Sequence, residues 1–277
     1  MFHTAQLGTT RPDASGDTRA RPPCGRRGGL GSGTVTDSAT PEITFRSDVT
    51  VELVKSSASD ADVVFAARVS TKGEQSLDDV DSDTSRSAGL INYLMRDRHG
   101  SPFEHNSFTF FVRAPIFVWR EHMRHRITSY NEESGRYREL EPVFYVPGPE
   151  RNLVQQGKPG AYEFVPGTPE QHALVDAEVR ASCTQAYAAY QAMLEAGVAR
   201  EVARIVLPVT IYSSAYVTMN ARALMNFLSL RTKREGSHFP SFPQREIEMV
   251  AEKYEDEFAR LMPLTYAAFQ TNGRVAP

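Results

Sequence analysis

The chain has 277 residues, of which 40% are hydrophobic and 23% are charged, and its formal net charge is −3. This balance excludes a generally basic nucleic-acid coat protein, so any anion site must come from a local cluster of positive charge. Its two cysteines exclude a disulfide-stapled scaffold and a zinc site of several thiolates, and no apolar run reaches the roughly 18 residues of a membrane span. The sequence therefore predicts a soluble, cytoplasmic, globular protein.

Residues 1–40 differ in composition from the rest of the chain. They contain seven of the 18 glycines and no lysine, and their apolar residues follow no repeating pattern. Such a segment cannot bury enough apolar surface to offset the entropy that it would lose on ordering. We therefore expect a disordered tail before a single domain at 41–277. A translation start farther downstream, near Val35, is an alternative explanation of this segment.

From residue 41 the hydrophobic pattern is dense and regular. Alternation of apolar and polar residues predicts strands at 49–54, 107–113, 142–147 and 209–218. A spacing of about 3.6 residues predicts helices at 60–70, 87–98, 115–126, 169–197, 199–207, 220–231 and 243–262. The acidic stretch at 74–83 lacks the spaced oxygen ligands of an EF-hand and is interpreted as a surface loop. We predict an α+β fold with a mostly antiparallel sheet flanked by helices, which dominate the C-terminal half.

Residues 119–138 concentrate polar side chains within a slightly acidic chain. Five arginines and two histidines lie in this stretch. Arg120 and Arg124 are four residues apart, so in a helix both would project from one face, where like charges are tolerated only if they are hydrated or meet an anion. Arginine also binds phosphate through paired donors. The stretch indicates an anion site, although a hydrated helix end with ordinary ion pairs would explain it too.

Three other chemistries fit these residues less well. A zinc ion at His122 and His125 would lie among three arginines, with no cysteine nearby. A cysteine nucleophile is disfavoured because Cys24 lies in the tail and Cys183 lies within a predicted helix, where a buried, inert thiol is expected. A nucleic-acid recognition helix would need a broader basic footprint than this region offers.

The same stretch resembles the signature of the flavin-dependent thymidylate synthases. Nine fixed positions agree in type and spacing, in the order Arg124-His125-Arg126-x-x-Ser129-x-Asn131-Glu132-x-Ser134-x-Arg136-Tyr137. Three further segments resemble motifs of that family, at 99–105, 201–208 and 220–228. The resemblance extends from about residue 45 to about residue 270.

The resemblance implies the fold of that family and an enzyme that converts dUMP to dTMP. It also implies methylenetetrahydrofolate as the one-carbon donor, reduced FAD as the hydride source, NADPH as the reductant of the flavin, and a homotetramer with active sites at subunit interfaces. Other thymidylate synthases add a cysteine to the uracil ring, and this chain offers no plausible cysteine for that step. A fixed arginine can instead stabilise negative charge that develops on the uracil carbonyl oxygens.

The resemblance assigns roles to individual residues. Arg231 is expected to be the catalytic arginine that polarises uracil. The residues expected to bind dUMP are Glu121, Arg124, Ser134, Gly135, Arg136, Arg204 and Arg231, with residues 121–124 coming from a neighbouring subunit. The residues expected to bind the flavin are His99, Ser101, Arg124, His125, Arg126, Glu132, Asn220, Arg222 and Asn226. No metal site is expected.

Two features depart from the family pattern. The family often places a histidine shortly after the catalytic arginine, but here the segment 232–242 is longer, which leaves open whether His238 takes that place. Residues 1–40 have no counterpart in the family. Two other functions stay open as alternatives: an inactive homologue that binds flavin and nucleotide without turnover, and an arginine-rich nucleic-acid-binding module.

Overall fold

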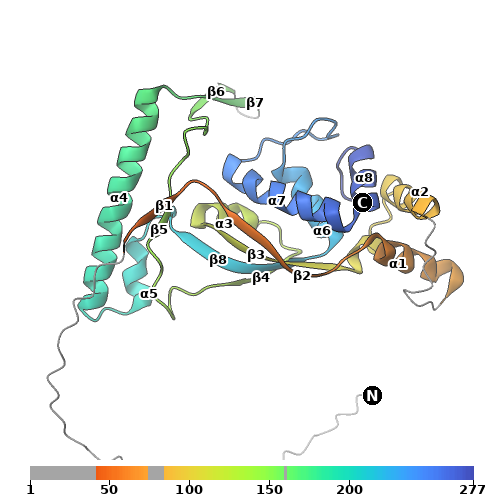
Figure 1. The fold of residues 1–277 in the computed structure, drawn as a ribbon, viewed down its shortest axis with the longest axis horizontal. Coiled ribbons are helices and arrows are strands. Elements are labelled where there is room, and N and C mark those ends of the chain that lie inside the picture. Colours follow the sequence, from red (N-terminus) through yellow and green to blue (C-terminus); the bar gives the residue numbers. More distant parts are fainter. Residues whose placement is uncertain (1–41, 74–83, 159–160) are drawn as a thin grey trace, which may run out of the picture. The chain divides into compact units, whose positions relative to one another are not determined.

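The structure, a computed structural model, describes residues 42–73, 84–158 and 161–277 (Figure 1). The predicted tail at 1–40 and the predicted acidic loop at 74–83 lie outside the described residues. In chain order the elements, with η marking a 3-10 helix, are β1 (Thr44–Arg46), β2 (Thr50–Ser57), α1 (Asp60–Lys72), α2 (Thr84–Arg96), η2 (Ser101–Glu104), β3 (Ser107–Pro115), α3 (Ile116–His122), β4 (Ser129–Glu132), β5 (Val143–Tyr145), β6 (Val154–Lys158), β7 (Ala161–Val165), α4 (Pro169–Glu195), α5 (Arg200–Ala203), η3 (Arg204–Val206), β8 (Tyr212–Met219), α6 (Ala221–Arg231), α7 (Arg245–Leu261) and α8 (Pro263–Thr271).

The main sheet has four strands in the order β2-β3-β8-β4, and every neighbouring pair is antiparallel. β3 lies between β2 and β8, with Phe110 opposite Val217 and Val112 opposite Ala215. The described residues also form a parallel pair, β1-β5, and an antiparallel hairpin, β6-β7. The predicted α+β fold with a mostly antiparallel sheet is confirmed.

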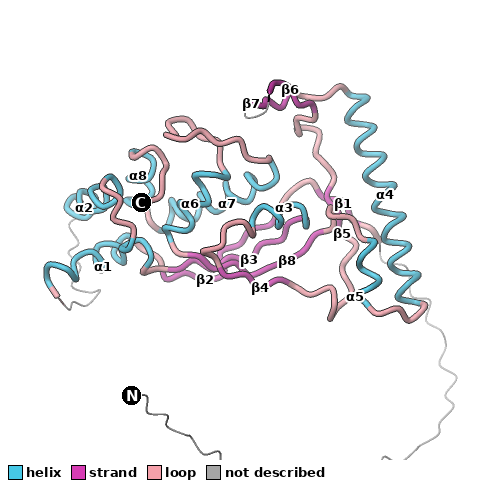
Figure 2. The backbone as a smooth tube through the Cα atoms, turned by 180° about the vertical axis from the view of Figure 1, so that it is seen from behind, coloured by secondary structure: helices cyan, strands magenta, loops and turns pink. Residues whose placement is uncertain are grey.

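The apolar face of β3 organises the core. Phe108, Phe110 and Val112 are fully buried and alternate with partly exposed neighbours, as expected for a strand that is covered on one face. Helices α3, α6 and α7 lie over that face (Figures 1 and 2). The ring of Phe110 packs on Tyr254 of α7 with centroids 4.3 Å apart. The helices that carry many of the predicted site residues therefore rest on one side of the sheet.

The predicted helix at 169–197 is confirmed as α4. It begins at a capping box, in which the Thr168 side chain accepts from the Gln171 backbone and the Gln171 side chain accepts from the Thr168 N–H. The helix buries only Cys183, Tyr187 and Tyr190, in a small second cluster around β5. Most of its surface is left uncovered by the described residues. Neither α4 nor any other helix in the described ranges combines the length and apolarity that crossing a membrane requires.

Cys183 is the buried, unreactive thiol that the sequence predicts. Its Sγ lies 3.2 Å from the Thr210 hydroxyl, and burial raises the pKa of the thiol. A thiol that is buried and protonated is a poor nucleophile.

Helix α3 ends at His122, earlier than predicted. Beyond it, the backbone N–H groups of Arg124 and His125 donate to carbonyl oxygens three residues back, which tightens the chain into a turn. The Tyr130 hydroxyl donates to the carbonyl oxygens of His122 and His125, at 2.8 and 3.1 Å. The expectation that Arg120 and Arg124 share one helical face is therefore wrong, because Arg124 lies beyond the end of the helix.

The structure also contains short elements that the hydrophobic pattern does not reveal, namely β1, η2, β4, the β6-β7 hairpin and α8. The predicted helix at 199–207 is divided into α5 and η3, and the strand predicted from residue 209 begins at Tyr212. The predicted helix at 243–262 ends at Leu261, because Pro263 occupies the first turn of α8. Each difference concerns a boundary or an element of at most nine residues.

We expect Phe258→Ala to lower the free energy of unfolding by about 3–5 kcal/mol, since it would leave a cavity among fully buried rings. Urea unfolding followed by circular dichroism measures this change. Val69→Ala on α1 is the control, because that side chain is 59% exposed. An equal loss in both variants would contradict the core described above.

Candidate active site

A buried hydrogen-bond network holds the turn that follows α3. The Nδ1 atom of His122 lies 3.1 Å from the Tyr130 hydroxyl, and its Nε2 atom lies 2.9 Å from the Tyr254 hydroxyl. Since the Tyr130 proton is donated to backbone carbonyl groups, Nδ1 is assigned as the donor to Tyr130, and Nε2 accepts from Tyr254. Burial lowers the pKa of His122 to about 3. The imidazole is therefore neutral, and it fixes the turn that carries Arg124, His125 and Arg126.

That turn forms one side of a cavity of about 500 Å³. The predicted flavin residues Asn220, Arg222 and Asn226 face it from α6 and its N-cap. The full lining is Glu104, Arg124, His125, Arg126, Ile127, Thr128, Asn220, Arg222, Ala223, Asn226, Leu230, Arg231, Ala276 and Pro277. Six of the nine residues predicted to bind flavin thus come together in one place.

The remaining predicted flavin residues lie elsewhere. His99 and Ser101 flank Gly100, where an added Cβ would lie 2.6 Å from the Arg222 guanidinium, so this segment adjoins the cavity without lining it. The exposed His99 ring stacks on Tyr93 with centroids 5.6 Å apart. Glu132 accepts a hydrogen bond from Ser213 at 2.6 Å and lines a separate depression of about 410 Å³ on the sheet.

The charges of the cavity suit an anionic, hydrogen-bonding group. Arg124 and Arg126 are exposed, and within the described ranges neither has a carboxylate at ion-pair distance. Arg222 is held by Glu104 at 2.5 Å and by the Pro277 backbone oxygen at 2.6 Å. Asn220 caps α6 by accepting from Ala223 N at 2.9 Å, so the positive end of the helix dipole adjoins the cavity. This donor set fits the pyrophosphate of a dinucleotide such as FAD.

Arg231 lies where this cavity meets a larger one of about 1080 Å³. Its Nη1 donates to the Glu121 carboxylate at 2.5 Å, and its Nε donates to His125 Nε2 at 3.1 Å. Accepting that bond requires a neutral imidazole. Burial, and then the positive charge of Arg231, lower the pKa of His125 to about 4. The guanidinium is therefore held between a carboxylate and an uncharged ring.

The residues predicted to hold the nucleotide phosphate form a separate cluster. Gly135 is closely surrounded, because a Cβ there would lie 3.0 Å from the Leu140 side chain and 3.3 Å from the Arg204 side chain, which would both have to shift slightly. Arg136 Nε donates to Glu201 at 2.9 Å, and the Ser134 hydroxyl accepts from Arg136 N at 3.3 Å. Residues 134–136 and 201–204 are thus neighbours, as the family resemblance implies. Within one chain this cluster shares no lining residue with the cavity.

Ion pairs also bear on the nucleic-acid alternative. Arg138 lies 3.2 Å from Glu141 and 3.5 Å from Glu133, and Arg136 is paired with Glu201. These carboxylates interrupt the basic surface. This disfavours a continuous row of positive side chains that could follow the phosphates of a nucleic acid.

Several lining residues could not be found from the sequence. Ala276 and Pro277 reach the cavity because Arg98 donates to the Ala276 oxygen at 2.9 Å and Arg222 donates to the Pro277 oxygen. No local pattern predicts these contacts between distant segments. His238 is exposed and donates its backbone N–H to Gly273 at 2.8 Å, and it lines none of the cavities described here.

We expect the free energy of unfolding to fall as the pH is lowered from about 6.5 to about 5. In this range His122 and His125 bind protons in the unfolded state and stay neutral in the folded state, so each contributes up to about 1.4 kcal/mol per pH unit. Urea unfolding at both pH values measures the slope. His122→Phe should flatten it and His105→Phe, at an exposed position, should not. An unchanged slope in His122→Phe would contradict the neutral, buried assignment.

Comparison with known proteins adds independent information. A family model described as thymidylate synthase complementing protein matches residues 52–264. The flavin-dependent thymidylate synthase of Streptomyces coelicolor is 71% identical over 238 residues, which cover 86% of this chain and 97% of that protein. The flavin-dependent thymidylate synthase of Tropheryma whipplei (strain TW08/27) is 58% identical over 84% of this chain and 97% of that protein. A crystal structure of the UMP/dUMP methylase PolB from Streptomyces cacaoi, bound with 5-Br dUMP, has a TM-score of 0.80 and 57% identity, covering 85% of this chain and all of that chain.

Proposed function

The chain belongs to the family of flavin-dependent thymidylate synthases, and we propose that it converts dUMP to dTMP with FAD as cofactor, methylenetetrahydrofolate as one-carbon donor and NADPH as reductant. The observation that carries this proposal is the position of Arg231, between Glu121 and His125 at the junction of two cavities. The free, buried thiol of Cys183 fits the reducing cytoplasm in which we propose that the enzyme works.

The cavity residues have a role in holding the flavin. Arg124 and Arg126 are available to bind its phosphates, while Arg222, Asn220 and Asn226 contribute donors from α6. When bound, the isoalloxazine ring supplies the hydride chemistry that no side chain can provide. The protein itself binds and orients the reactants, which lowers the entropic part of the barrier.

Arg231 has the charge and the fixed geometry to activate uracil. Methylation requires electron density at C5 of the ring, and a guanidinium beside a uracil carbonyl oxygen stabilises the charge that develops there. Glu121 and His125 restrain two of its nitrogens, so little reorganisation is needed when substrate binds. Because Cys183, the one cysteine of the described residues, lies in the second cluster, this activation proceeds without a thiol adduct.

The dUMP phosphate is assigned to Ser134, Gly135, Arg136 and Arg204. Within one chain these residues line neither of the two cavities that Arg231 lines, so we infer that a neighbouring subunit completes each site in a homotetramer. Exposed apolar side chains support this inference, since patches of this kind commonly mark protein interfaces. Ile127 lines the cavity, and the others lie within five residues of Arg136 or Arg204 in the sequence: Tyr137, Val202, Ile205, Val206 and Val209. Residues 121–124 of one subunit would then reach the nucleotide of another, and Glu132 would approach the flavin in the same way.

We expect the purified protein to bind FAD with a yellow flavin spectrum and to form dTMP from dUMP when methylenetetrahydrofolate and NADPH are supplied. Titration of the flavin spectrum with dUMP measures nucleotide binding, and product analysis measures turnover. Folded protein that binds flavin and dUMP but forms no dTMP would instead be an inactive homologue. Protein that binds neither ligand, but binds duplex DNA with a steep salt dependence, would contradict the assignment altogether.

We expect Arg231→Ala to reduce kcat by about 100-fold or more while the flavin content stays close to that of the wild type. We expect Ser134→Ala or Arg136→Ala to weaken dUMP binding by roughly tenfold or more, because each removes a donor to a charged phosphate. Steady-state kinetics and flavin-monitored titration measure both effects. Arg180→Ala on α4 is the control, since that exposed side chain contacts Asp176 and the Phe45 ring and lines neither of the cavities at Arg231. Equal losses of flavin and turnover in Arg231→Ala would refute its catalytic role.

A further inference from the structure

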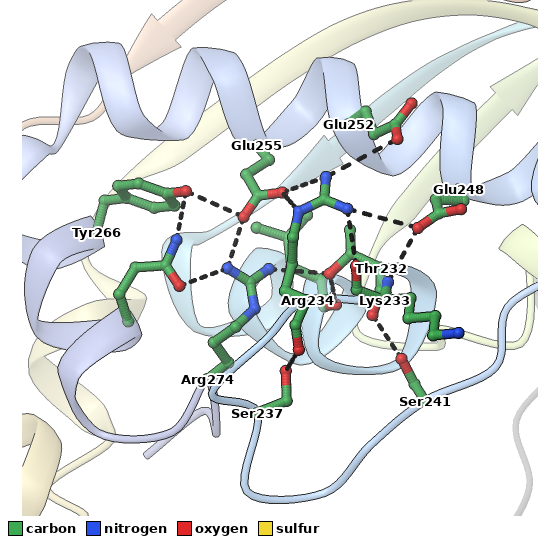
Figure 3. A network of polar contacts seen from close by, with 12 residues as sticks. Thr232, Lys233, Arg234, Ser237, Ser241, Glu248, Glu252, Glu255, Tyr266 and Arg274 are labelled. Atoms are coloured by element: carbon green, nitrogen blue, oxygen red, sulfur yellow. Dashed lines mark hydrogen bonds and ion pairs between the residues drawn. The ribbon is translucent and has the colours of Figure 1, made fainter.

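Arg274, just after α8, is an arginine buried outside the proposed binding machinery (Figure 3). It is 2% exposed and has a left-handed backbone with φ of 56°. Its Nη1 contacts Glu255 at 2.6 Å and Gln270 at 2.8 Å, and its Nη2 donates to the Thr232 hydroxyl at 2.9 Å. Burying a guanidinium is costly unless it is paired and hydrogen-bonded. Arg274 therefore needs these partners in place, and it ties together the segments that carry them.

One of those partners directly follows Arg231. The Thr232 hydroxyl donates to the Leu228 carbonyl oxygen at 2.7 Å while accepting from Arg274, and the Thr232 N–H donates to the same carbonyl oxygen at 3.1 Å. The Ser241 hydroxyl donates to the Thr232 carbonyl oxygen at 2.5 Å. Thr232 thus closes the last turn of α6, the turn from which Arg231 projects.

Carboxylates of helix α7 hold the residues that directly follow Thr232. Glu255 lies between two guanidinium groups, with Arg234 3.0 Å from one oxygen and Arg274 at the other (Figure 3). Glu248 accepts from Lys233 N at 3.0 Å. Lys233 and Arg234, the two residues after Thr232, are therefore held by buried or half-buried carboxylates of α7.

The residues that follow Arg274 line the flavin cavity. Arg274 N donates to the Phe269 carbonyl oxygen at 2.9 Å, which closes α8 and directs the chain back toward α6. Ala276 and Pro277 then face the cavity, held by Arg98 and Arg222. A single guanidinium thus connects one wall of the cavity with the helix end that presents Arg231.

We infer that Arg274 is a positioning residue that sets the orientation of Arg231 through its hydrogen bond to the Thr232 hydroxyl. This inference rests on the catalytic role proposed for Arg231. A residue that only stabilised the fold would change the unfolding temperature and leave turnover per flavin-loaded subunit unchanged. A residue that positions Arg231 changes kcat, since small displacements of a catalytic group cost rate steeply.

The most specific test substitutes Thr232, which is uncharged, and so leaves the buried charges of Arg274 and Glu255 unchanged. Thr232→Val is nearly isosteric and removes the acceptor, whereas Thr232→Ser keeps the hydroxyl. In the flavin-loaded enzyme we expect Thr232→Val to lower kcat by about tenfold or more, with a smaller effect on the KM for dUMP, and Thr232→Ser to stay close to wild type. Equal activities in the two variants, or a change confined to thermal stability, would overturn the inference.

A double-mutant cycle tests the route through Arg274. Arg274→Lys keeps the positive charge beside Glu255, but one ammonium cannot reproduce the planar fork that reaches both Glu255 and Thr232. We expect Arg274→Lys and Thr232→Val to lower kcat similarly and the double variant to lose little more. If the fold-losses in kcat of the two single variants multiply in the double variant, Arg274 and Thr232 act independently of each other. That result would overturn the inference.

Two controls separate the possible failures. Arg260→Lys changes an exposed arginine that pairs with Glu257 on α7, and we expect its kcat to match the wild type. Wild-type protein that forms no dTMP would refute the proposed function and this inference with it. Wild-type dTMP formation together with full turnover in Thr232→Val would refute the positioning role alone.

Discussion

The candidate site depends on an uncharged histidine held between two tyrosine hydroxyls. Because His122 is neutral, its two ring nitrogens can bond Tyr130 and Tyr254 inside the core without the cost of burying an unpaired charge. Tyr130 in turn binds the carbonyl oxygens at the end of α3. The helix stops there, and the following turn carries residues 124–126 to the cavity instead of continuing along a helical face.

The arginines of this protein divide according to their partners. Arg231 and Arg274 are held by carboxylates and further hydrogen-bond partners, so their guanidinium groups have fixed positions. Arg124 and Arg126 have no such partner in the described part of the chain and can meet a ligand anion. Fixed arginines suit electrostatic activation, because preorganised charge needs no rearrangement during reaction. These two unpaired arginines suit phosphate binding, for which the ligand itself supplies the countercharge, whereas Arg136 is paired with Glu201 and would exchange that carboxylate for a phosphate.

The fold of one chain leaves the site in two parts. The cavity beside α6 and the cluster around Gly135 each bring together residues that are far apart in sequence, and exposed apolar side chains lie near both. An arrangement in which neighbouring copies cover those side chains would join the two parts. Assembly would then be a condition for activity as well as a source of stability, since neither part alone provides both anion sites.

The sequence by itself determined the features that depend on local periodicity and spacing. The strand through Phe110, the long helix α4 and helix α6 follow from apolar repeats, and the run from Arg124 to Tyr137 identifies the family because its spacing is local. Only the tertiary structure decided the end of α3, the separation of Glu132 from the cavity beside α6, and the burial of Arg274. These features arise from contacts between distant segments, whose energies depend on burial and charge pairing that no sequence window contains.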